Sequence, residues 1–224
     1  MATSWLILDI GNSAVKWARF SQGTLGDAGS VAIEKANIAN ERAWHSALTD
    51  VPLEATDHIG IVSVVPDATG PAQQAASHHG KSVTVLKVDG SLPFTMTYDT
   101  PETLGTDRLA AAAAAWLDHG APSARSILAV DAGTALTIEV IRRDATYLGG
   151  VISPGLRMLR DALAQNGAQL PEVPLERPPH PIGSSTQTAL QSGIMHGFTD
   201  MTEGLLVRLT QTLPDTPRIV LTGG

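Results

Sequence analysis

A short motif occurs twice in this 224-residue chain, each time directly after an apolar run. The first copy is Asp9-Ile10-Gly11-Asn12-Ser13, and the second, about half the chain later, is Asp131-Ala132-Gly133-Thr134-Ala135. Further apolar runs follow both copies, so each motif is predicted to form the tip of a β-hairpin. A repeat at this spacing predicts two related halves that face each other.

Apolar runs, turn residues and helix signals predict the elements around the two motifs. Strands are expected at residues 5–10, 15–20, 59–65, 83–88, 127–130, 136–141, 147–152 and 219–221. Helices are expected at residues 73–76, 106–117 and 185–198, and from Pro154 onward with Ser153 as its N-cap. Residues 166–181 hold five prolines and predict a long irregular loop. Small residues at 119–123 predict a linker, and hence two domains, 1–118 and 119–224.

Composition excludes several classes of site and partner. The chain has no cysteine, which removes disulfides, thiol nucleophiles, thiolate zinc sites and iron–sulfur clusters. Its formal net charge of −7 disfavours nonspecific binding to the phosphate backbone of DNA or RNA. The start of the chain does not resemble a signal peptide, and no apolar run approaches the roughly 20 residues of a membrane span. We therefore expect a cytoplasmic protein with neither a nucleic-acid nor a membrane partner.

The repeated motif suits the binding of a phosphorylated ligand. A glycine-rich tip lets backbone N–H groups approach phosphate oxygens, while an adjacent carboxylate needs a cation between itself and the phosphate. Asp9 before Gly11 therefore predicts a Mg²⁺–nucleotide site, to which Lys16 adds a positive charge. Asp131 and Thr134 would repeat the arrangement in the other half. The alternative is two hairpins with ordinary turn residues. Neither a P-loop nor a Rossmann glycine motif is present.

A second polar segment precedes the alanine-rich run at 109–117. It reads Tyr98-Asp99-Thr100-Pro101-Glu102-Thr103-Leu104-Gly105-Thr106-Asp107-Arg108. Asp107 could accept a proton from a substrate hydroxyl and Arg108 could hold a substrate anion. The alternative is that Thr106 or Asp107 only caps a helix. Likewise, the glycines of residues 149–155 either allow close backbone approach to a ligand or form a tight strand–helix junction.

The histidines give no metal signal in the sequence. None of the seven forms a His-x-x-x-His pair, and the side chains of the adjacent His78 and His79 are expected to diverge. The nucleophile motif Gly-x-Ser-x-Gly is absent as well. We therefore expect neither a histidine metal centre nor a serine hydrolase.

Taken together, these residues resemble type III pantothenate kinases, within the superfamily of acetate and sugar kinases, Hsp70 and actin. The two Asp-x-Gly motifs resemble its phosphate motifs, and Thr222-Gly223-Gly224 resembles its adenosine motif. The narrower match is to Tyr98-x-x-Pro-Glu-x-Leu-Gly-x-Asp107-Arg108, supported by residues 149–155 and 185–193. Members of that family usually continue past the Thr-Gly-Gly motif with a further helix.

The resemblance implies an α/β fold of two similar ribonuclease H-like, actin-like ATPase lobes with a cleft between them. It implies ATP-dependent phosphorylation of pantothenate, the first step of coenzyme A biosynthesis, by a homodimer. Asp107 is then the proton acceptor, and the pantothenate pocket is formed by Tyr98, Gly105, Thr106, Asp107, Arg108 and Thr186. The residues implied to contact ATP are Asp9, Ile10, Gly11, Asn12, Ser13, Ala14, Val15, Lys16 and Thr134. Asp131 would hold a monovalent cation, K⁺ or NH₄⁺, and Asp9 the Mg²⁺.

Two other functions remain open at this point. A non-catalytic regulatory homologue, like the Bvg accessory factors, could keep ATP binding without needing Asp107. A kinase of the same superfamily could act on another hydroxy acid, since Arg108 suits any carboxylate.

Overall fold

The computed structural model describes residues 3–88 and 92–223. The chain divides into two compact units, one of Met1–Ser91 and Thr100–Ala110, the other of Leu92–Asp99 and Ala111–Gly224. The boundary predicted between residues 118 and 119 lies inside the second unit, and as a domain boundary it stays a prediction. Each unit is described by itself below.

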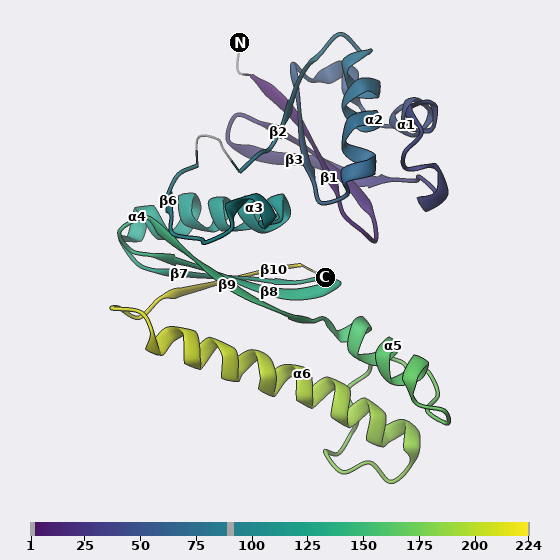
Figure 1. Cartoon of the computed structure of the whole chain (residues 1–224), viewed down its shortest axis with the longest axis vertical. Helices are drawn as coiled ribbons and strands as arrows, with labels where there is room; N and C mark the ends of the chain where they lie inside the picture. The colour runs from purple at the N-terminus through teal and green to yellow at the C-terminus, as the bar shows by residue number, and fades with distance from the viewer. Residues whose placement is uncertain (1–2, 89–91, 224) are drawn as a thin grey trace. The chain divides into compact units, whose positions relative to one another are not determined.

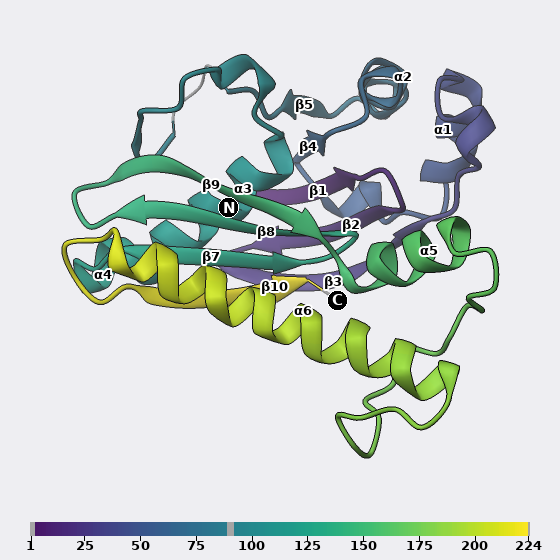
Figure 2. The same ribbon diagram turned by 60° about the horizontal axis from the view of Figure 1, so that its bottom comes forward.

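The first unit is built on a five-stranded sheet in the order β3-β2-β1-β4-β5. Figure 1 labels its first three strands, and Figure 2 labels all five. Its first three strands form an antiparallel meander, and β4 and β5 continue the sheet parallel to β1. The bounds are β1 Ser4–Ile10, β2 Val15–Ser21, β3 Thr24–Val31, β4 His58–Ser63 and β5 Ser82–Val85.

Helices α1 (Glu41–Leu48) and α2 (Pro66–Ser77) share an apolar core with this sheet. Alternation along β1 buries Leu6, Leu8 and Ile10 completely. Trp44 and Leu48 of α1 enter the same core, as do the small side chains of α2, which allow close packing: Ala68, Ala72, Ala75 and Ala76. The unit also contains three short 3₁₀ turns: η1 (Lys35–Asn37), η2 (Leu53–Ala55) and η3 (Pro101–Thr103).

The second unit repeats the order of four strands of the first sheet, and its fifth strand lies at the opposite edge. Its sheet runs β10-β7-β8-β9-β6, with β7, β8 and β9 antiparallel and β10 parallel to β7. The bounds are β6 Thr95–Met96, β7 Ile127–Ala132, β8 Ala135–Arg142, β9 Thr146–Pro154 and β10 Arg218–Gly223. Thus β7 occupies in this sheet the place that β1 occupies in the first.

The long helix α6 (Thr186–Gln211) crosses one face of the second sheet (Figure 2). Its apolar side packs on the buried strand residues through Phe198, Met201, Leu205, Leu206 and Leu209. Helix α5 (Leu156–Asn166) follows β9, and no helix or strand lies between α5 and α6. Helix α3 (Thr106–Ala115) spans the division between the units and continues through the π-helical turn η4 (Trp116–Gly120) into α4 (Ala121–Ser123).

The two sheets confirm the predicted α/β class with two ribonuclease H-like halves. Both predicted hairpins and the long irregular loop are confirmed as well. The cleft predicted between the two halves stays a prediction.

Three local predictions are wrong. Residues 119–123 are helical and do not form a linker. Strand β9 runs to Pro154, so the next helix begins at Leu156 with Gly155 at its N-cap. Helix α2 begins at Pro66, where a proline at the first helical position needs no N–H partner, and not at residue 73. Strands β3 and β6 and helix α1 have no counterpart in the sequence prediction.

Candidate functional site

The first Asp-x-Gly motif forms the turn between β1 and β2. Asp9 lies opposite Lys16 in the antiparallel register, and the N–H of Gly11 donates to the carbonyl of Ala14 at 3.0 Å. Of residues 9–16, Ile10 and Val15 are buried at 0% and 3% exposure. Their side chains anchor the turn in the core, so only their backbone could meet a ligand. Asp9, Asn12, Ser13, Ala14 and Lys16 are exposed.

The start of α3 is attached to the end of β4. The Thr106 hydroxyl donates to the carbonyl of Ser63 at 2.7 Å, and the N–H of Ser63 donates back to Thr106 Oγ1 at 3.2 Å. Ser63 is the register partner of Ile10, the last residue of β1. Within the first unit, the first turn of α3 and the first phosphate motif therefore lie at the same edge of the sheet, at the carboxyl ends of β1 and β4. Ligands of open α/β sheets bind at such edges.

Asp107 is held in a defined direction at this edge. Its Oδ1 accepts the backbone N–H of Arg108 at 2.7 Å, while the residue stays exposed. A Cβ on Gly105 would lie 2.5 Å from that oxygen, so glycine leaves the space that the carboxylate occupies. Arg108 itself is 9% exposed. The capping alternative holds in part for Asp107, whose Oδ1 accepts a backbone N–H of the first turn, whereas the hydroxyl of Thr106 bonds the backbone of β4.

The second Asp-x-Gly motif has the same setting in the second unit. Asp131 lies opposite Thr137 on β8 and Thr222 on β10, so it too stands at the carboxyl end of two parallel strands. The N–H of Gly155 donates to the carbonyl of Thr134 at 3.2 Å, and a Cβ on Gly155 would overlap the carbonyl oxygens of Gly133 and Thr134. The glycine at 155 is therefore required by close approach of two backbone segments.

The carboxylate of Asp131 also faces a glycine. Gly223 has a φ of +100°, and a Cβ there would lie 2.5 Å from Asp131 Oδ1. The second phosphate motif, Gly155 and the end of β10 thus share one sheet edge within the second unit.

Tyr98 lies next to a buried pair, Tyr147 and Glu139, that the sequence analysis did not predict. Tyr147 on β9 donates its hydroxyl to Glu139 on β8 at 2.5 Å, and both residues are fully buried. The ring of Tyr98 lies 6.1 Å from that of Tyr147, and Phe94 stacks on Tyr147 at 5.5 Å. A Cβ on Gly149 would lie 3.2 Å from Tyr98. The available sequence signal was one acid inside the apolar strand of residues 135–142.

The last predicted substrate residue, Thr186, is the first residue of α6 and is exposed. Ser185 caps this helix in a reciprocal capping box with Thr188. Farther along the helix, Gln191 and Ser192 donate to the carbonyls of Pro174 and Pro181 at 3.1 and 2.5 Å. These bonds join the proline-rich segment to α6.

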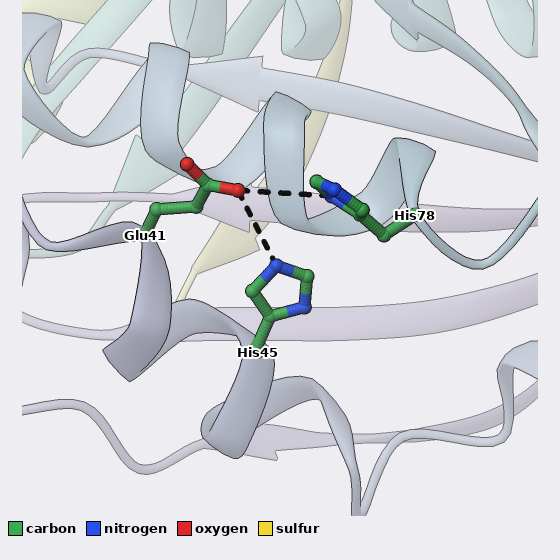
Figure 3. Close-up of side chains that lie close together, drawn as sticks. All are labelled: Glu41, His45 and His78. Atoms are coloured by element: carbon green, nitrogen blue, oxygen red, sulfur yellow. Dashed lines mark hydrogen bonds and ion pairs between the residues drawn. The ribbon is translucent and has the colours of Figure 1, made fainter.

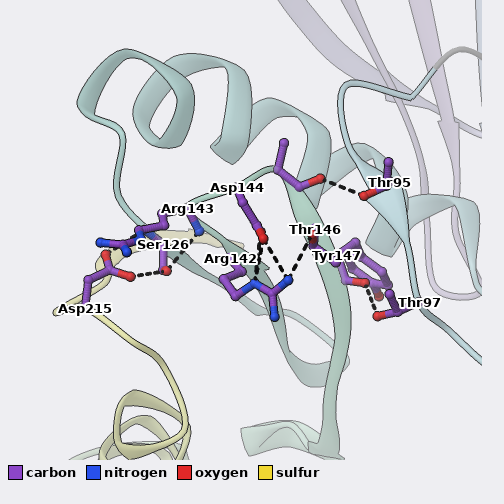
Figure 4. A network of polar contacts seen from close by, with 10 residues as sticks. Thr95, Thr97, Ser126, Arg142, Arg143, Asp144, Thr146, Tyr147 and Asp215 are labelled. Carbon is purple, nitrogen blue, oxygen red and sulfur yellow. Dashed lines mark hydrogen bonds and ion pairs between the residues drawn. The ribbon is translucent and has the colours of Figure 1, made fainter.

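Polar contacts away from these positions stabilise the second sheet (Figure 4). Arg142 donates to Asp144 across the turn between β8 and β9, and these bonds lower the pKa of Asp144 from 3.8 to about 2. Ser126 donates through its N–H and hydroxyl to Asp215. Burial alone would raise the pKa of Asp215, but the two bonds from Ser126, together with the charges of Arg143 and Arg125, leave the pKa below 3.8.

No helix in residues 3–88 and 92–223 combines the length and apolarity needed to cross a membrane.

Comparisons with solved structures support the fold. A Baf family transcriptional activator from Campylobacter jejuni aligns with a TM-score of 0.55 at 20% identity, over 98% of this chain and 83% of its own. A Ppx/GppA phosphatase from Aquifex aeolicus aligns with a TM-score of 0.52 at 12% identity, over 99% of this chain and 68% of its own. At these identities the likeness shows the fold alone.

Comparisons with curated sequences are closer. Type III pantothenate kinase 1 of Symbiobacterium thermophilum is 41% identical over 73% of this chain and 63% of its own length. The type III pantothenate kinases of Roseiflexus sp. and Acidothermus cellulolyticus are 34% and 32% identical over 98% of this chain and 86% of theirs. The sequence model of the family described as type III pantothenate kinase matches residues 5–208. This chain therefore belongs to the type III pantothenate kinase family.

Proposed function

We propose that this chain transfers the γ-phosphoryl group of ATP to the hydroxyl of pantothenate, the first step of coenzyme A biosynthesis. The observation that carries the proposal is the family match over residues 5–208, together with relatives of that name at up to 41% identity. The aligned part of this chain covers 63% to 86% of the length of these relatives.

In this proposal Asp107 receives the proton of the substrate hydroxyl. Its Oδ1 already accepts a backbone N–H, so Oδ2 is the oxygen assigned to the substrate. Phosphoryl transfer passes through a loose transition state, in which the base chiefly orients the attacking oxygen. A carboxylate fixed by its own helix turn is suited to that task, since positioning lowers the barrier to in-line attack.

Pantothenate would lie against Tyr98, Gly105, Thr106, Arg108 and Thr186. Arg108 supplies the positive charge for the substrate carboxylate. The hydroxyl of Thr106 already bonds Ser63, so we assign to Thr106 mainly the placement of Asp107. Tyr98 contributes a ring whose position is set by Tyr147.

ATP would be held by the hairpin turn at residues 9–16 and by Thr134. The exposed carboxylate of Asp9 beside a glycine turn fits a Mg²⁺ ion, whose ligands are oxygens. Asp131, half-buried against the backbone of Gly223, fits a monovalent cation, K⁺ or NH₄⁺. When bound, these ions offset the negative charge of the phosphates. The proposal also includes a homodimer and a cytoplasmic location.

A coupled assay of ADP release tests the proposal. With pantothenate, Mg·ATP and K⁺ we expect turnover, and with Na⁺ in place of K⁺ we expect little. Mass spectrometry of the product should show one added phosphoryl group on pantothenate. ADP release that is absent, or that does not depend on pantothenate, would contradict the kinase assignment.

The same assay separates the two alternatives. A regulatory homologue would bind ATP without releasing ADP, and a kinase for another hydroxy acid would turn over only when that acid replaces pantothenate. The presence of both Asp107 and Arg108 favours an enzyme, because binding ATP alone requires neither.

A further inference from the structure

Three metal-ligating side chains converge in the first unit, away from the residues assigned to the kinase reaction. Glu41 and His45 lie one turn apart on α1, and His78 follows the last residue of α2 (Figure 3). One ligand atom from each lies within 4.8 Å of the other two. Sequence spacing gave no sign of this cluster, because the two histidines are distant in the chain and only the packing of α1 on α2 brings them together.

The spacing of these atoms is close to that of a metal site. Glu41 Oε1 lies 3.4 Å from His45 Nε2 and 3.6 Å from His78 Nδ1. Zinc–nitrogen bonds of 2.0–2.1 Å in a tetrahedron place neighbouring ligand atoms about 3.3 Å apart. The distances from Glu41 to the two histidines therefore fit a metal site with small adjustments. The distance between the ligand nitrogens of His45 and His78 would be shortened by a modest rotation of the rings.

The side chains are placed on a firm frame. Residues four apart on a helix share a face, which aims Glu41 and His45 the same way. Asn40 caps α1 by accepting the N–H of Arg42 at 3.0 Å, and Trp44 fixes the helix in the core. Helix α1 holds Glu41 and His45, and His78 lies at the C-cap of α2, so little backbone order has to be created when an ion binds.

The cluster is open to solvent. The side chains of Glu41, His45 and His78 are 39%, 36% and 65% exposed, so an ion can enter and water can complete its coordination. Nδ1 of His78 also lies 2.9 Å from the carbonyl of Gln74. Ligation through Nδ1 would replace that exposed hydrogen bond, at little cost because water can satisfy the carbonyl.

The geometry points to a binding site for a divalent transition-metal ion of the zinc class, formed by Glu41, His45 and His78. Two imidazoles and one carboxylate favour such ions over Mg²⁺ and Ca²⁺, which take oxygen ligands. The bound ion would join α1 to α2 and so stabilise the first unit. It is separate from the Mg²⁺ and K⁺ of the proposed kinase reaction, and its test does not depend on that reaction.

Calorimetric titration of Zn²⁺ into untagged, chelator-treated protein tests the site. We expect one zinc bound per chain and a higher melting temperature, since an ion that binds only the native state stabilises it. At free zinc 100-fold above the dissociation constant, the unfolding equilibrium should shift about 100-fold toward the native state. His78→Ala should weaken binding by at least about tenfold, a loss seen even for residues that only support a ligand.

His79→Ala is the matched control, because His79 is adjacent to His78 and lies outside the cluster. It should bind zinc as the wild type does. Co²⁺ gives a second readout: its visible absorption bands should appear with the wild type and His79→Ala and be lost in His45→Ala and Glu41→Gln. Equal zinc binding by wild type and His78→Ala, or no rise in melting temperature, would overturn the assignment.

Discussion

At the level of single residues, the carboxylate of Asp107, to which we assign the substrate proton, is held by its own helix turn. Its Oδ1 accepts the first-turn N–H of Arg108, which sets the direction of the carboxylate, and Gly105 leaves room for it. A side chain held in this way can orient a substrate hydroxyl with little further loss of freedom.

We predict that Asp107→Asn abolishes phosphorylation of pantothenate while ATP binding is nearly unchanged. Asparagine can keep the bond to the backbone N–H through its amide oxygen but cannot take up the hydroxyl proton. The coupled ADP assay measures turnover, and calorimetric titration measures ATP binding. Asp118→Asn, an exposed substitution beyond α3, serves as control and should leave both unchanged. A mutant that loses ATP binding would contradict the role assigned to Asp107.

Tyr147→Phe tests the buried pair behind Tyr98. The change removes the hydroxyl that donates to Glu139, a carboxylate at 0% exposure. Depriving a buried acceptor of a donor costs about 1–3 kcal/mol, so we expect the free energy of unfolding to fall by that amount. Urea titration at pH 7 measures it. Tyr98→Phe, which keeps the ring and leaves the bond to Glu139 in place, should have a clearly smaller effect on stability.

At the scale of the elements, the caps decide where helices begin. The hydroxyl oxygen of Ser185 accepts the N–H of Thr188, and the hydroxyl oxygen of Thr188 accepts the N–H of Ser185. This capping box places Thr186 at the first position of α6. The sequence pattern predicted this start, whereas Gly155, not the predicted Ser153, precedes α5.

We predict that Ser185→Ala lowers the free energy of unfolding by about 1 kcal/mol, the usual cost of losing an N-cap hydroxyl. The neighbouring exposed substitution Ser184→Ala is the control and should be near neutral. Urea titration compares the two, and hydrogen exchange should show faster exchange in the first turn of α6 only for Ser185→Ala. If both variants behave alike, the capping box contributes nothing measurable.

At the scale of the whole molecule, both units carry carboxylates whose pKa is lowered by hydrogen bonds. In the first unit Ser4 lowers the pKa of Asp57 through its N–H and hydroxyl. In the second, bonds from Arg142 lower that of Asp144 to about 2, and those from Ser126 lower that of Asp215 against the effect of burial. Acid therefore weakens contacts in both units.

We predict that stability falls as the pH drops from about 4 toward 2. A carboxyl whose pKa is lowered in the folded state binds a proton more readily when the chain is unfolded. Its contribution to the free energy of unfolding is therefore complete above the unfolded pKa of 3.8, and it is lost as the pH falls through the folded pKa. Urea midpoints measured at pH 5, 4 and 3 should decrease in that order. Asp215→Asn should reduce this pH dependence, and a midpoint constant from pH 5 to 3 would contradict the prediction.

The local parts of this protein could be predicted from the amino-acid sequence. Asp-x-Gly turns after apolar strands predicted both hairpins, and the resemblance carried by residues 98–108 led to the family that the match over residues 5–208 shows. These features depend on neighbours in the chain, such as alternation along a strand or a glycine in a turn, so they can be recognised one segment at a time.

Contacts between residues that are distant in the chain became known from the packed fold. Pairing of β1 with β4 placed Ser63 beside Ile10, and the bond between Thr106 and Ser63 placed the start of α3 there as well. Tertiary packing also brought Tyr147 to Glu139 and His78 to Glu41. The exposed strand β3 and the short β6 also depend on their partner strands more than on their own residues. Such contacts form because the apolar faces of strands and helices are buried against one another. Burial is not directional, so it would stabilise many arrangements of helices and strands with similar apolar faces. Close packing of the side chains selects one arrangement among them.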